Sequence, residues 1–279
     1  MRIRVEGGHP LNGTYTPSGN SNAAISLLAA ALLAEDTVTL HNVPDTISVQ
    51  SMLEIASSLG ASVARDDHSV RITTPQIIRR SLTGEKTSGF TGALLYLAPI
   101  LIRREFVRLE LDFPLNRIRT HLEAMRDLGL DIVTVDGGVE IRPATWGYHD
   151  ILLTQTSVTA TAIVMMLAAH FGKETIIRNA ASEPHLQQLA HLLERMGAQV
   201  QGVRSNVLHI FGKEGGLHGA EYTIGPDHIE TASIAAIAAM LAGRVRIEGI
   251  NHSEMRMIGK IYRRLGVNLD IGTDDIFVP

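Results

Sequence analysis

The sequence predicts an α/β (α+β) protein built from tandem repeats, and two observations carry that prediction. A Leu-Gly or Met-Gly step recurs about every 69 residues along the 279-residue chain. The four steps are Leu59-Gly60, Leu128-Gly129, Met196-Gly197 and Leu265-Gly266. Before each step the same order of segments returns: an Ala-rich apolar run, a short β-branched run and a more polar run. A period of this length indicates one supersecondary unit copied in tandem.

The Ala-rich apolar runs predict buried helices, because they are long and poor in β-branched residues. These helices are expected at Asn22–Leu33, Phe90–Ile102, Val158–Phe171 and Glu230–Leu241. Each is followed by a β-branched run that predicts a strand. The strands are expected at Thr37–Val43, Phe106–Leu111, Thr175–Asn179 and Val245–Ile250.

A second, more polar helix then ends at each glycine step. In the third repeat it covers Pro184–Met196, with Pro184 in the first turn, where its missing N–H is tolerated. Gly197 follows and supplies the left-handed residue that closes the helix, a conformation that glycine adopts without a Cβ clash. Another strand precedes each first helix and a hairpin completes the unit, which therefore reads β-α-β-α-β-β. The hairpin turns are expected at Asp67-His68, Asp136-Gly137-Gly138, Ser205-Asn206 and Asp274-Asp275.

Four such units predict two domains. The first three units are expected to form one pseudo-threefold domain at residues 21–213. An incomplete second domain is expected from residues 1–20, with a first strand at Arg2–Val5, together with the fourth unit in residues 214–279. The apolar face of Ala232–Leu241 in this fourth unit would stay uncovered, which predicts a homo-oligomer or a partner bound through the fourth repeat.

Composition and charge argue against several classes of protein. The net charge of −4 lacks the basic excess of a nucleic-acid-binding surface. The longest apolar run, Val158–Ala169, is too short to cross a bilayer, and no signal peptide precedes the first expected strand. The chain has no cysteine, which excludes disulfides and thiolate metal sites. Without metal-ligand or phosphate-loop motifs, we expect a cytoplasmic protein with no metal, no cofactor, and neither nucleic acid nor membrane as partner.

Helix N-termini are the first candidate binding positions. The segment Thr16–Asn22 joins a strand to the first Ala-rich helix, and Gly19 allows a tight turn there. Unpaired backbone N–H groups and the helix dipole make such a terminus an anion site, although ordinary helix capping explains the same residues. The arrangement returns at Gln155-Thr156-Ser157 and at Gly225-Pro226-Asp227. If the units pack around pseudo-threefold axes, several termini converge and favour a multiply charged anion such as a phosphate.

A second candidate lies in the loop Leu111–Arg119. This loop carries the carboxylate of Asp112 and the guanidiniums of Arg117 and Arg119. Arginine suits bidentate recognition of a phosphate or a carboxylate. A solvated loop with a surface salt bridge is the alternative interpretation of the same residues.

Several segments resemble the UDP-N-acetylglucosamine enolpyruvyltransferase (1-carboxyvinyltransferase) family. They follow in order along the whole chain: Ser18–Ala24, His41–Pro44, Leu59–Ala61, Ser157–Thr161, Asn179–Ala181, Glu183-Pro184, Pro226-Asp227 and Ile229–Thr231. The resemblance implies an enolpyruvyltransferase-like fold and the transfer of enolpyruvate from phosphoenolpyruvate to the 3-hydroxyl of UDP-N-acetylglucosamine. That reaction begins peptidoglycan precursor synthesis for the cell wall, and the resemblance implies no cofactor for it.

The resemblance also implies roles for individual residues. Substrate binding falls to Ser21, Asn22, Arg117, Gln155, Ser157, Val158 and Asp227, and a catalytic role to Asp112. Ser21 stands where the family has the lysine that binds phosphoenolpyruvate, so a charge-assisted contact is lost. Gln155 likewise replaces a common lysine in the segment that contacts uridine.

The family has six repeats, which makes this chain a short and divergent member with four. The general-base aspartate and a phosphate-binding arginine of the family lie in the two repeats that are missing, so the chain is expected to be catalytically impaired or truncated. Two alternatives stay open. One is a non-catalytic homolog that binds a nucleotide sugar or a protein partner, and the other is a relative of the shikimate-pathway enolpyruvyltransferase, which shares the repeat. Whether the chain is an enzyme is left undecided by the sequence.

Overall fold

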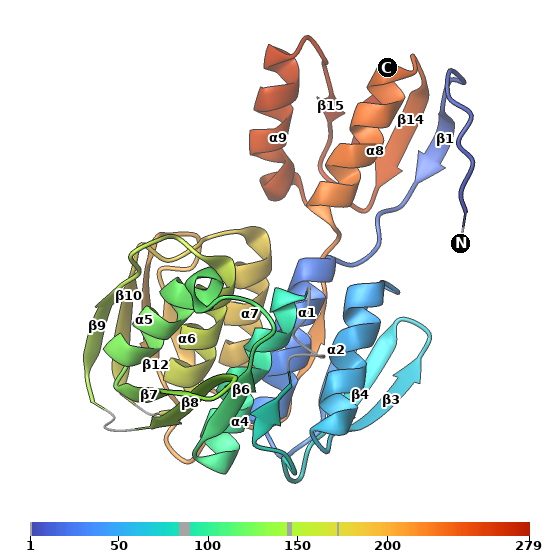
Figure 1. Cartoon of the computed structure of the whole chain (residues 1–279). Coiled ribbons are helices and arrows are strands. Elements are labelled where there is room, and N and C mark those ends of the chain that lie inside the picture. The colour runs from blue at the N-terminus through green and yellow to red at the C-terminus, as the bar shows by residue number, and fades with distance from the viewer. Residues whose placement is uncertain (1, 84–89, 144–146, 172) are drawn as a thin grey trace. The chain divides into compact units, whose positions relative to one another are not determined.

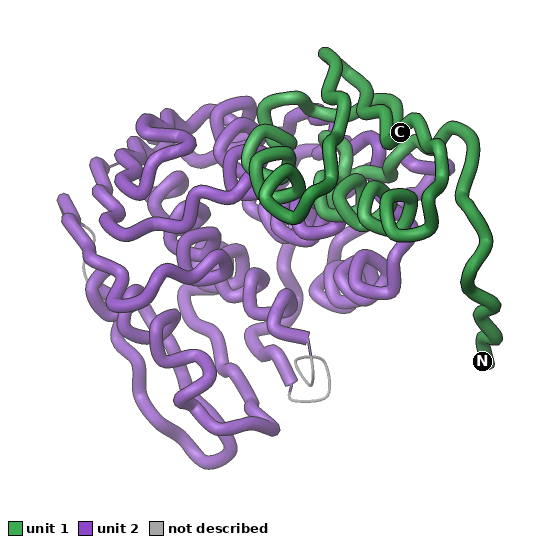
Figure 2. Tube along the Cα trace, turned by 90° about the horizontal axis from the view of Figure 1, so that it is seen from above, with its two compact units in different colours: residues 1–20, 225–279 green, residues 21–224 purple. Residues whose placement is uncertain are grey.

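The computed structural model describes residues 2–83, 90–143, 147–171 and 173–279. The chain forms two compact units (Figure 2). Unit 1 consists of residues 1–20 and 225–279, and unit 2 of residues 21–224. The chain therefore passes between the units twice, at Asn20-Ser21 and at Ile224-Gly225.

Unit 2 contains three repeats of one pattern (Figure 1). The first comprises α1 (Ser21–Ala30), the 3-10 helix η1 (Ala31–Leu33), β2 (Val38–His41), α2 (Ile47–Ser58), β3 (Ser62–Asp66) and β4 (Ser69–Thr73). The second comprises β5 (Ser81–Leu82), η2 (Thr91–Tyr96), α4 (Leu97–Arg104), β6 (Val107–Glu110), η3 (Leu115–Ile118), α5 (Arg119–Asp127), β7 (Leu130–Val135) and β8 (Gly138–Pro143). The third comprises β9 (His149–Leu152), α6 (Val158–His170), β10 (Glu174–Arg178), α7 (Pro184–Arg195), β11 (Gln199–Gln201) and β12 (Val207–Phe211). The predicted alternation of helices and strands is confirmed.

Unit 1 holds the fourth repeat. Its elements are β1 (Asn12–Tyr15), α8 (His228–Met240), β14 (Arg244–Glu248), α9 (His252–Arg264), β15 (Asp270–Ile271) and β16 (Asp275–Val278). The strand expected at Arg2–Val5 is a wrong prediction, because residues 2–10 are exposed and without regular structure. The alternating pattern of that segment is typical of a strand, but it is β1 that pairs with β14.

Each repeat is covered by a four-stranded sheet of the same order. The four orders are β9-β10-β12-β11, β5-β6-β8-β7, β13-β2-β4-β3 and β1-β14-β16-β15. In each sheet the first strand runs parallel to the second, and the remaining pairs are antiparallel. Two strands are exchanged between repeats. The strand before α1 is β1, which belongs to the fourth sheet, whereas the strand before α8 is β13 (Glu221–Thr223), which pairs with β2 in the first.

This exchange moves the boundary between the units. The sequence places it between residues 213 and 214, just after the third hairpin. In the structure β13 pairs with β2 of the first repeat, so the chain stays in unit 2 as far as Ile224.

Three inner helices fill the centre of unit 2. These are α1 with η1, η2 with α4, and α6, whose residues Ala160–Ala169 are all buried. The more polar helices α2, α5 and α7 lie outside them, and α7 buries one stripe through Leu186, Leu189 and Leu193. Because alanine has a small side chain, the inner helices can pack closely with few voids. Among the described helices, none has the length and apolarity that a bilayer crossing requires.

The helix expected at Phe90–Ile102 is interrupted. Residues Thr91–Tyr96 form the 3-10 helix η2, and an α-helix begins only at Leu97. Pro99 gives the physical reason, since a proline inside a continuous helix removes one hydrogen bond and clashes with the preceding turn. With α4 starting at Leu97, Pro99 falls in the first turn, where backbone N–H groups have no partner within the helix.

The four glycines of the repeated steps all have positive φ, as the capping argument predicts. They are Gly60, Gly129, Gly197 and Gly266, with φ values of 108°, 87°, 112° and 84°. At the first step the N–H of Gly60 donates to the carbonyl of Ser57 at 3.0 Å, and the N–H of Ala61 to that of Ala56 at 3.1 Å. This pair of bonds is the Schellman arrangement that closes a helix.

Two of these glycines allow a matched stability test. A Cβ at Gly60 would lie 2.7 Å from the carbonyl oxygen of Gln76, whereas a Cβ at Gly266 would meet no atom within 4 Å. We expect Gly60→Ala to lower the free energy of unfolding by about 3 kcal/mol, because a left-handed alanine costs roughly 1–2 kcal/mol and the backbone contact adds to it. Gly266→Ala should cost only about 1 kcal/mol. Urea denaturation of both variants checks this, and equal losses would contradict it.

Candidate binding site at converging helix N-termini

The N-terminal turns of the three inner helices of unit 2 line one pocket of about 160 Å³. Its lining residues are Asn22, Ile25 and Ser26 of α1, Phe90 to Gly92 and Leu95 at η2, Val158, Thr159 and Ala162 of α6, and His185 and Leu186 of α7. The pocket therefore lies where three repeats meet. Of the three termini named from the sequence, those of α1 and α6 meet at this pocket together with η2, whereas the terminus of α8 belongs to unit 1.

Local hydrogen bonds fix the N-terminus of α6. Ser157 is extended, with φ −139° and ψ 123°, and its side chain accepts from the N–H of Ala160 at 3.3 Å. The buried hydroxyl of Thr161 donates to the carbonyl of Ser157 at 2.7 Å and accepts from the N–H of Ala181 at 3.1 Å. These bonds tie the first turn of α6 to the segment that follows β10, so the edge of the pocket is held from two sides.

The N-terminus of α1 is connected to α2. The hydroxyls of Ser21 and Thr46 lie 3.0 Å apart, and Thr46 caps α2 by accepting from the N–H of Val49 at 3.3 Å. Ser21 stands at the position where the family named in the sequence analysis has a lysine. Its hydroxyl is polar but uncharged, and it is already bonded to the neighbouring helix.

The described lining of the pocket is polar but contains neither lysine nor arginine. Its polar groups are the amide of Asn22, the hydroxyls of Ser26, Thr91 and Thr159, and the imidazole of His185. Helix N-termini carry a partial positive charge and present N–H groups, which favours an anion or an electronegative group. A phosphate held here would have hydrogen bonds and helix dipoles, without a fixed positive charge in the described lining.

His121 of α5 lies behind this lining. Its Nε2 is 2.6 Å from the hydroxyl of Thr159, which faces the pocket. Burial lowers the pKa of His121 to about 4, against the smaller opposing effect of a hydrogen bond with the backbone of Ile118. The ring is therefore neutral at pH 7, and it holds the hydroxyl of a pocket residue without adding charge.

One arginine of the segment Leu111–Arg119 forms a surface salt bridge, as the alternative interpretation of this segment expects. Arg119 Nε donates to Glu123 at 2.6 Å, and Thr154 donates to the other oxygen of the same carboxylate at 2.7 Å. The bond from Arg119 is the main cause of a lowered pKa at Glu123, followed by that from Thr154. Arg119 is thus engaged in an i,i+4 pair on α5.

The predicted site residues fall into three groups. Asn22 and Val158 line the pocket, and Ser21 and Ser157 flank it at the starts of α1 and α6. Asp112, Arg117 and Gln155 are exposed and do not belong to the described lining. Asp227 lies in unit 1. Unit 2 therefore brings together the residues at helix N-termini but not the carboxylate and guanidinium of the loop.

Asp227 is the N-cap of α8. Its carboxylate accepts from the N–H of Ile229 at 2.8 Å and from that of Glu230 at 3.3 Å. The Glu230 carboxylate in turn accepts from the hydroxyls of Tyr15 and Ser18, and the bond to Glu230 is the main cause that raises the pKa of Tyr15 to about 12. Both acidic groups at this terminus thus make hydrogen bonds within unit 1.

Sequence reasoning missed two pocket residues, Thr159 and His185, and also His121 behind the lining. His185 is buried, with an exposed fraction of only 7 %. Helical periodicity carries the missing signal, because His185 is four residues from buried Leu189, and His121 is four from buried Met125. Thr159 has no such signal, since its role depends on a histidine from another repeat.

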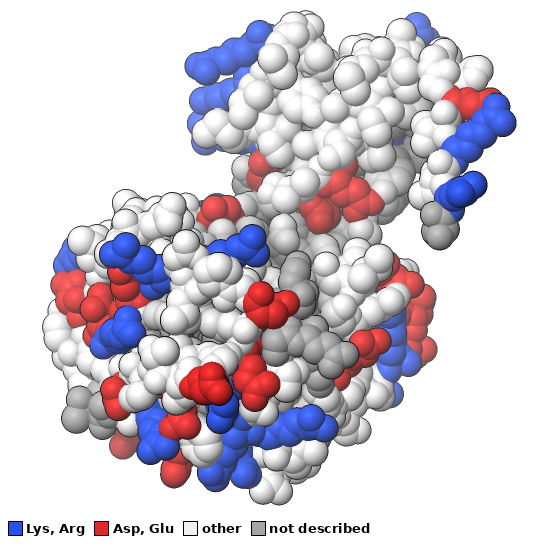
Figure 3. Space-filling view, viewed as in Figure 1, with Lys and Arg blue, Asp and Glu red and all other residues white. Residues whose placement is uncertain are grey.

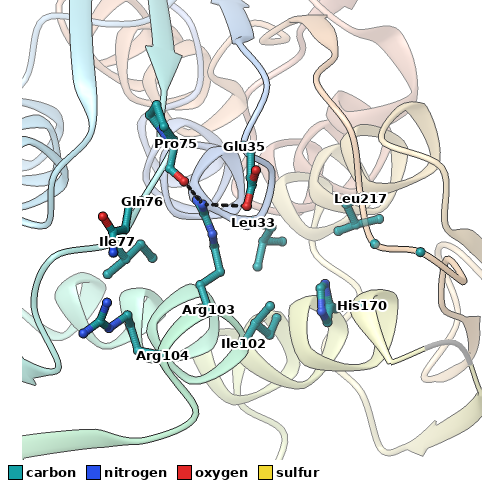
Figure 4. Close-up of a pocket in the computed structure, with 12 residues that line it drawn as sticks. Leu33, Glu35, Pro75, Gln76, Ile77, Ile102, Arg103, Arg104, His170 and Leu217 are labelled. Atoms are coloured by element: carbon teal, nitrogen blue, oxygen red, sulfur yellow. Dashed lines mark hydrogen bonds and ion pairs between the residues drawn. The ribbon is translucent and has the colours of Figure 1, made fainter.

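The opposite ends of the inner helices form a second cavity of about 340 Å³ (Figure 4). Arg103 lies within it with a side chain only 9 % exposed, and donates to the carbonyls of Thr74 at 2.5 Å and Pro75 at 2.7 Å. It also reaches the carbonyls of Leu32 and Ala34 and pairs with Glu35 at 3.5 Å. Burial lowers the pKa of Arg103, opposed by Glu35. This guanidinium satisfies backbone carbonyls at helix and strand ends, so the cavity is a structural junction.

Comparison with known proteins agrees with this arrangement. The family described as EPSP synthase (3-phosphoshikimate 1-carboxyvinyltransferase) matches residues 5–278. The UDP-N-acetylglucosamine 1-carboxyvinyltransferase of Borrelia garinii subsp. bavariensis is 32 % identical over 98 % of this chain and 65 % of its own length. That of Treponema pallidum is 37 % identical over 95 % of this chain and 63 % of its own length. The chain thus spans slightly less than two thirds of these relatives.

A solved structure shows the same fold. The enolpyruvyl transferase NikO from Streptomyces tendae superposes with a TM-score of 0.86 at 22 % identity, over 98 % of this chain and 66 % of the other. The repeat order, the helix N-termini and the family match lead to one conclusion. The chain belongs to the EPSP synthase (3-phosphoshikimate 1-carboxyvinyltransferase) family.

Proposed function

We propose that this chain serves enolpyruvyl transfer from phosphoenolpyruvate to the 3-hydroxyl of UDP-N-acetylglucosamine, and that unit 2 binds the nucleotide sugar. The observation that supports this most is the pocket at the three helix N-termini, with Asn22 and Val158 in its lining. Sequence resemblance assigns these two residues to substrate, and the curated relatives carry the corresponding name. The reaction would take place in the cytoplasm and feed cell-wall precursor synthesis.

The size of the pocket limits what it holds. Sites for drug-sized ligands are roughly 300–1,000 Å³, and this pocket is about 160 Å³. A nucleotide sugar would place only one group inside it, with the remainder over the N-terminal turns of α1 and α6. The helix N-termini favour a phosphate of the diphosphate as that group.

The chemistry of the reaction indicates which of the two substrates unit 2 would bind weakly. A proton adds to the methylene carbon of the enol, and the sugar hydroxyl forms a bond to the neighbouring carbon while giving up its proton. Phosphate then leaves with its electron pair while the new methyl carbon loses a proton, so that the double bond re-forms. Phosphate departure needs positive charge around the leaving group. Among the described residues lining the pocket there is no lysine or arginine. We therefore propose that unit 2 binds the nucleotide sugar but holds phosphoenolpyruvate poorly.

Binding and turnover separate this proposal from its alternatives. Calorimetry with UDP-N-acetylglucosamine should show binding that Asn22→Ala weakens about tenfold, because one lining amide is removed (about 1.4 kcal/mol). Asn206→Ala, in the exposed turn before β12, is the matched control and should bind like the parent chain. Absence of binding in a folded chain would reject the proposal, and binding without phosphate release would favour the non-catalytic homolog. Binding of 3-phosphoshikimate instead would favour the shikimate-type relative.

Restoring a charge at the start of α1 tests the phosphate site. We expect Ser21→Lys to raise the affinity for phosphoenolpyruvate at least tenfold, because a charge-assisted hydrogen bond contributes roughly 1.5–3 kcal/mol. Ser57→Lys on the exposed face of α2 adds the same charge elsewhere and should leave the affinity unchanged. Calorimetric titration measures both. If Ser21→Lys gives no gain, the pocket has been remodelled beyond loss of the lysine.

Association through the fourth repeat is also part of the proposal. The support for it is the exposure of apolar residues in the fourth repeat, of which Met240 at the end of α8 is 76 % and Leu265 just after α9 is 74 % exposed. Large exposed apolar patches mark interaction sites.

A further inference from the structure

The cavity at the C-terminal ends of the inner helices contains two nitrogens that the fold leaves unused. Arg104 is the last residue of α4 and His170 the last of α6, and both line the cavity. Nε of Arg104 and Nδ1 of His170 are buried and have no hydrogen-bond partner among the residues that the structure describes. Buried polar atoms without a partner are rare in native structures, because each costs free energy. Two of them in one cavity are explained if a ligand completes their hydrogen bonds.

Arg103 differs from these two residues, although it lies in the same cavity. Its guanidinium donates to the carbonyls of Thr74 and Pro75 and pairs with Glu35. In Figure 4 the side chain of Arg103 points toward Pro75 and Glu35, whereas that of Arg104 leaves α4 in another direction. A ligand bound by Arg104 would therefore leave the structural bonds of Arg103 in place.

The charge of the described lining favours an anion. Two guanidiniums face the single carboxylate of Glu35, whose side chain is 79 % exposed. Burial, followed by the charge of Arg103, lowers the pKa of His170, so this imidazole is neutral at pH 7 and serves as a hydrogen-bonding group. Arginine suits recognition of a carboxylate or a phosphate.

The attraction for an anion is local to the cavity. The chain as a whole has a net charge of −4. Figure 3 shows acidic and basic side chains mixed over the visible face of unit 2, so that face presents no broad field of one sign. Small anions would therefore be held by the cavity and not by the surface in general.

Glycine keeps the wall beside His170 open. Gly215 and Gly216 both line the cavity with left-handed backbone, at φ 85° and 88°. A Cβ at Gly216 would lie 3.6 Å from Cε1 of His170, and a Cβ at Gly215 would meet no described atom within 4 Å. This segment therefore places no side chain in the space beside the ring. The cavity measures about 340 Å³, at the lower end of the roughly 300–1,000 Å³ typical of small-molecule sites.

We propose that this cavity binds a small organic anion, whose carboxylate or phosphate group accepts from Nε of Arg104 and which also hydrogen-bonds Nδ1 of His170. Such a ligand joins the ends of α4 and α6, two inner helices that pack against each other. It would stabilise unit 2, because it binds only the folded chain. The site lies at the other end of the inner helices from the pocket of the proposed function, and the proposal does not depend on that function.

NMR of the histidine ring signals tests the proposal, with malonate as the carboxylate probe and glycerol 3-phosphate as the phosphate probe. We expect at least one of the two to shift the imidazole signal of His170, which the spectrum of His170→Gln assigns. The other pocket has His185 in its lining and His121 behind it, so binding there would shift those two signals instead. No shift at His170 with either probe at millimolar concentration, or shifts confined to His121 and His185, would overturn the proposal.

Three variants then locate the bound anion. Arg104→Met should weaken its binding about tenfold or more, because a charge-assisted hydrogen bond is lost. Arg126→Met, on the exposed side of α5, removes a guanidinium elsewhere and should keep the affinity of the parent chain. Asn22→Ala alters only the pocket of the proposed function and should also keep it.

Thermal melting adds a readout that also reports folding. The anion should raise the melting temperature of the parent chain and of Arg126→Met, but much less that of Arg104→Met. Circular dichroism establishes beforehand that each variant is folded. If folded Arg104→Met binds the anion as tightly as the parent chain does, Arg104 is not part of a binding site and the proposal is wrong.

Discussion

Replacing Arg103 by methionine is expected to lower the free energy of unfolding by about 4 kcal/mol, the largest single effect that the structure predicts for a side chain. Methionine keeps much of the apolar volume but removes every donor. The carbonyls of Thr74 and Pro75 accept from this guanidinium at 2.5 and 2.7 Å in a setting where the arginine side chain is 9 % exposed. Hydrogen bonds to a charged group contribute roughly 1.5–3 kcal/mol each, and a carbonyl left unpaired in a buried place adds a desolvation penalty.

The neighbouring residue provides the control for this prediction. Arg104 lines the same cavity, but its buried Nε has no hydrogen-bond partner. Arg104→Met should therefore cost less than about 1 kcal/mol. Guanidinium chloride denaturation of both variants, analysed with a common slope, measures the difference. Similar losses for the two would show that Arg103 contributes through packing of its stem and not through the carbonyls.

The pH dependence of stability is expected to carry a contribution of about 3 kcal/mol from His121. Its pKa in the folded chain is about 4 because of burial, against an ordinary value of 6.5. Above pH 6.5 the ring is neutral in both states and contributes no pH dependence. As the pH falls from 6.5 to 4, the unfolded chain binds a proton that the folded chain does not, so the free energy of unfolding decreases. Each unit of pKa difference corresponds to about 1.4 kcal/mol.

Chemical denaturation between pH 4 and pH 7 isolates this contribution. His121→Gln removes the titrating ring, so the variant should lose less stability on acidification than the parent chain. His191→Gln removes a histidine from the exposed side of α7 and should retain the full acid dependence of the parent. If His121→Gln and the parent lose stability in parallel, the ring does not resist protonation in the folded chain.

The parts of the fold that depend on local chemistry were predictable from the sequence. The glycine after each second helix has positive φ because the left-handed cap is set by a few neighbouring residues. The inner helices lie where the Ala-rich runs predict them, apart from the break before Leu97 that Pro99 requires. The choice of the first strand was not predictable in this way. Arg2–Val5 alternates polar and apolar residues more regularly than Asn12–Tyr15, yet it is Asn12–Tyr15 that becomes a strand, through pairing with the distant β14.

In the candidate site, too, some residues were predictable from their local sequence and others depend on distant contacts. Capping residues such as Ser157 and Asp227 can be recognised from the few residues around them, and both cap helices in the structure. The contact between His121 and Thr159 joins α5 of one repeat to α6 of the next, so neither residue alone indicates it. The roles of Asp112 and Arg117 follow from the family resemblance, and a resemblance in a loop does not determine side-chain direction. Both are exposed, and their assignment stays a prediction.

The exchange of β1 and β13 has a consequence for the nascent chain. When the first repeat has left the ribosome, β2 still has an open edge, because its neighbour β13 is made only after the third repeat. An unpaired edge strand is a template for wrong pairing with other chains. Pairings between segments far apart in sequence also form slowly. Within unit 2, the sheet that is begun first is therefore the last to be completed, and its open edge is where a chaperone or a competing strand would act.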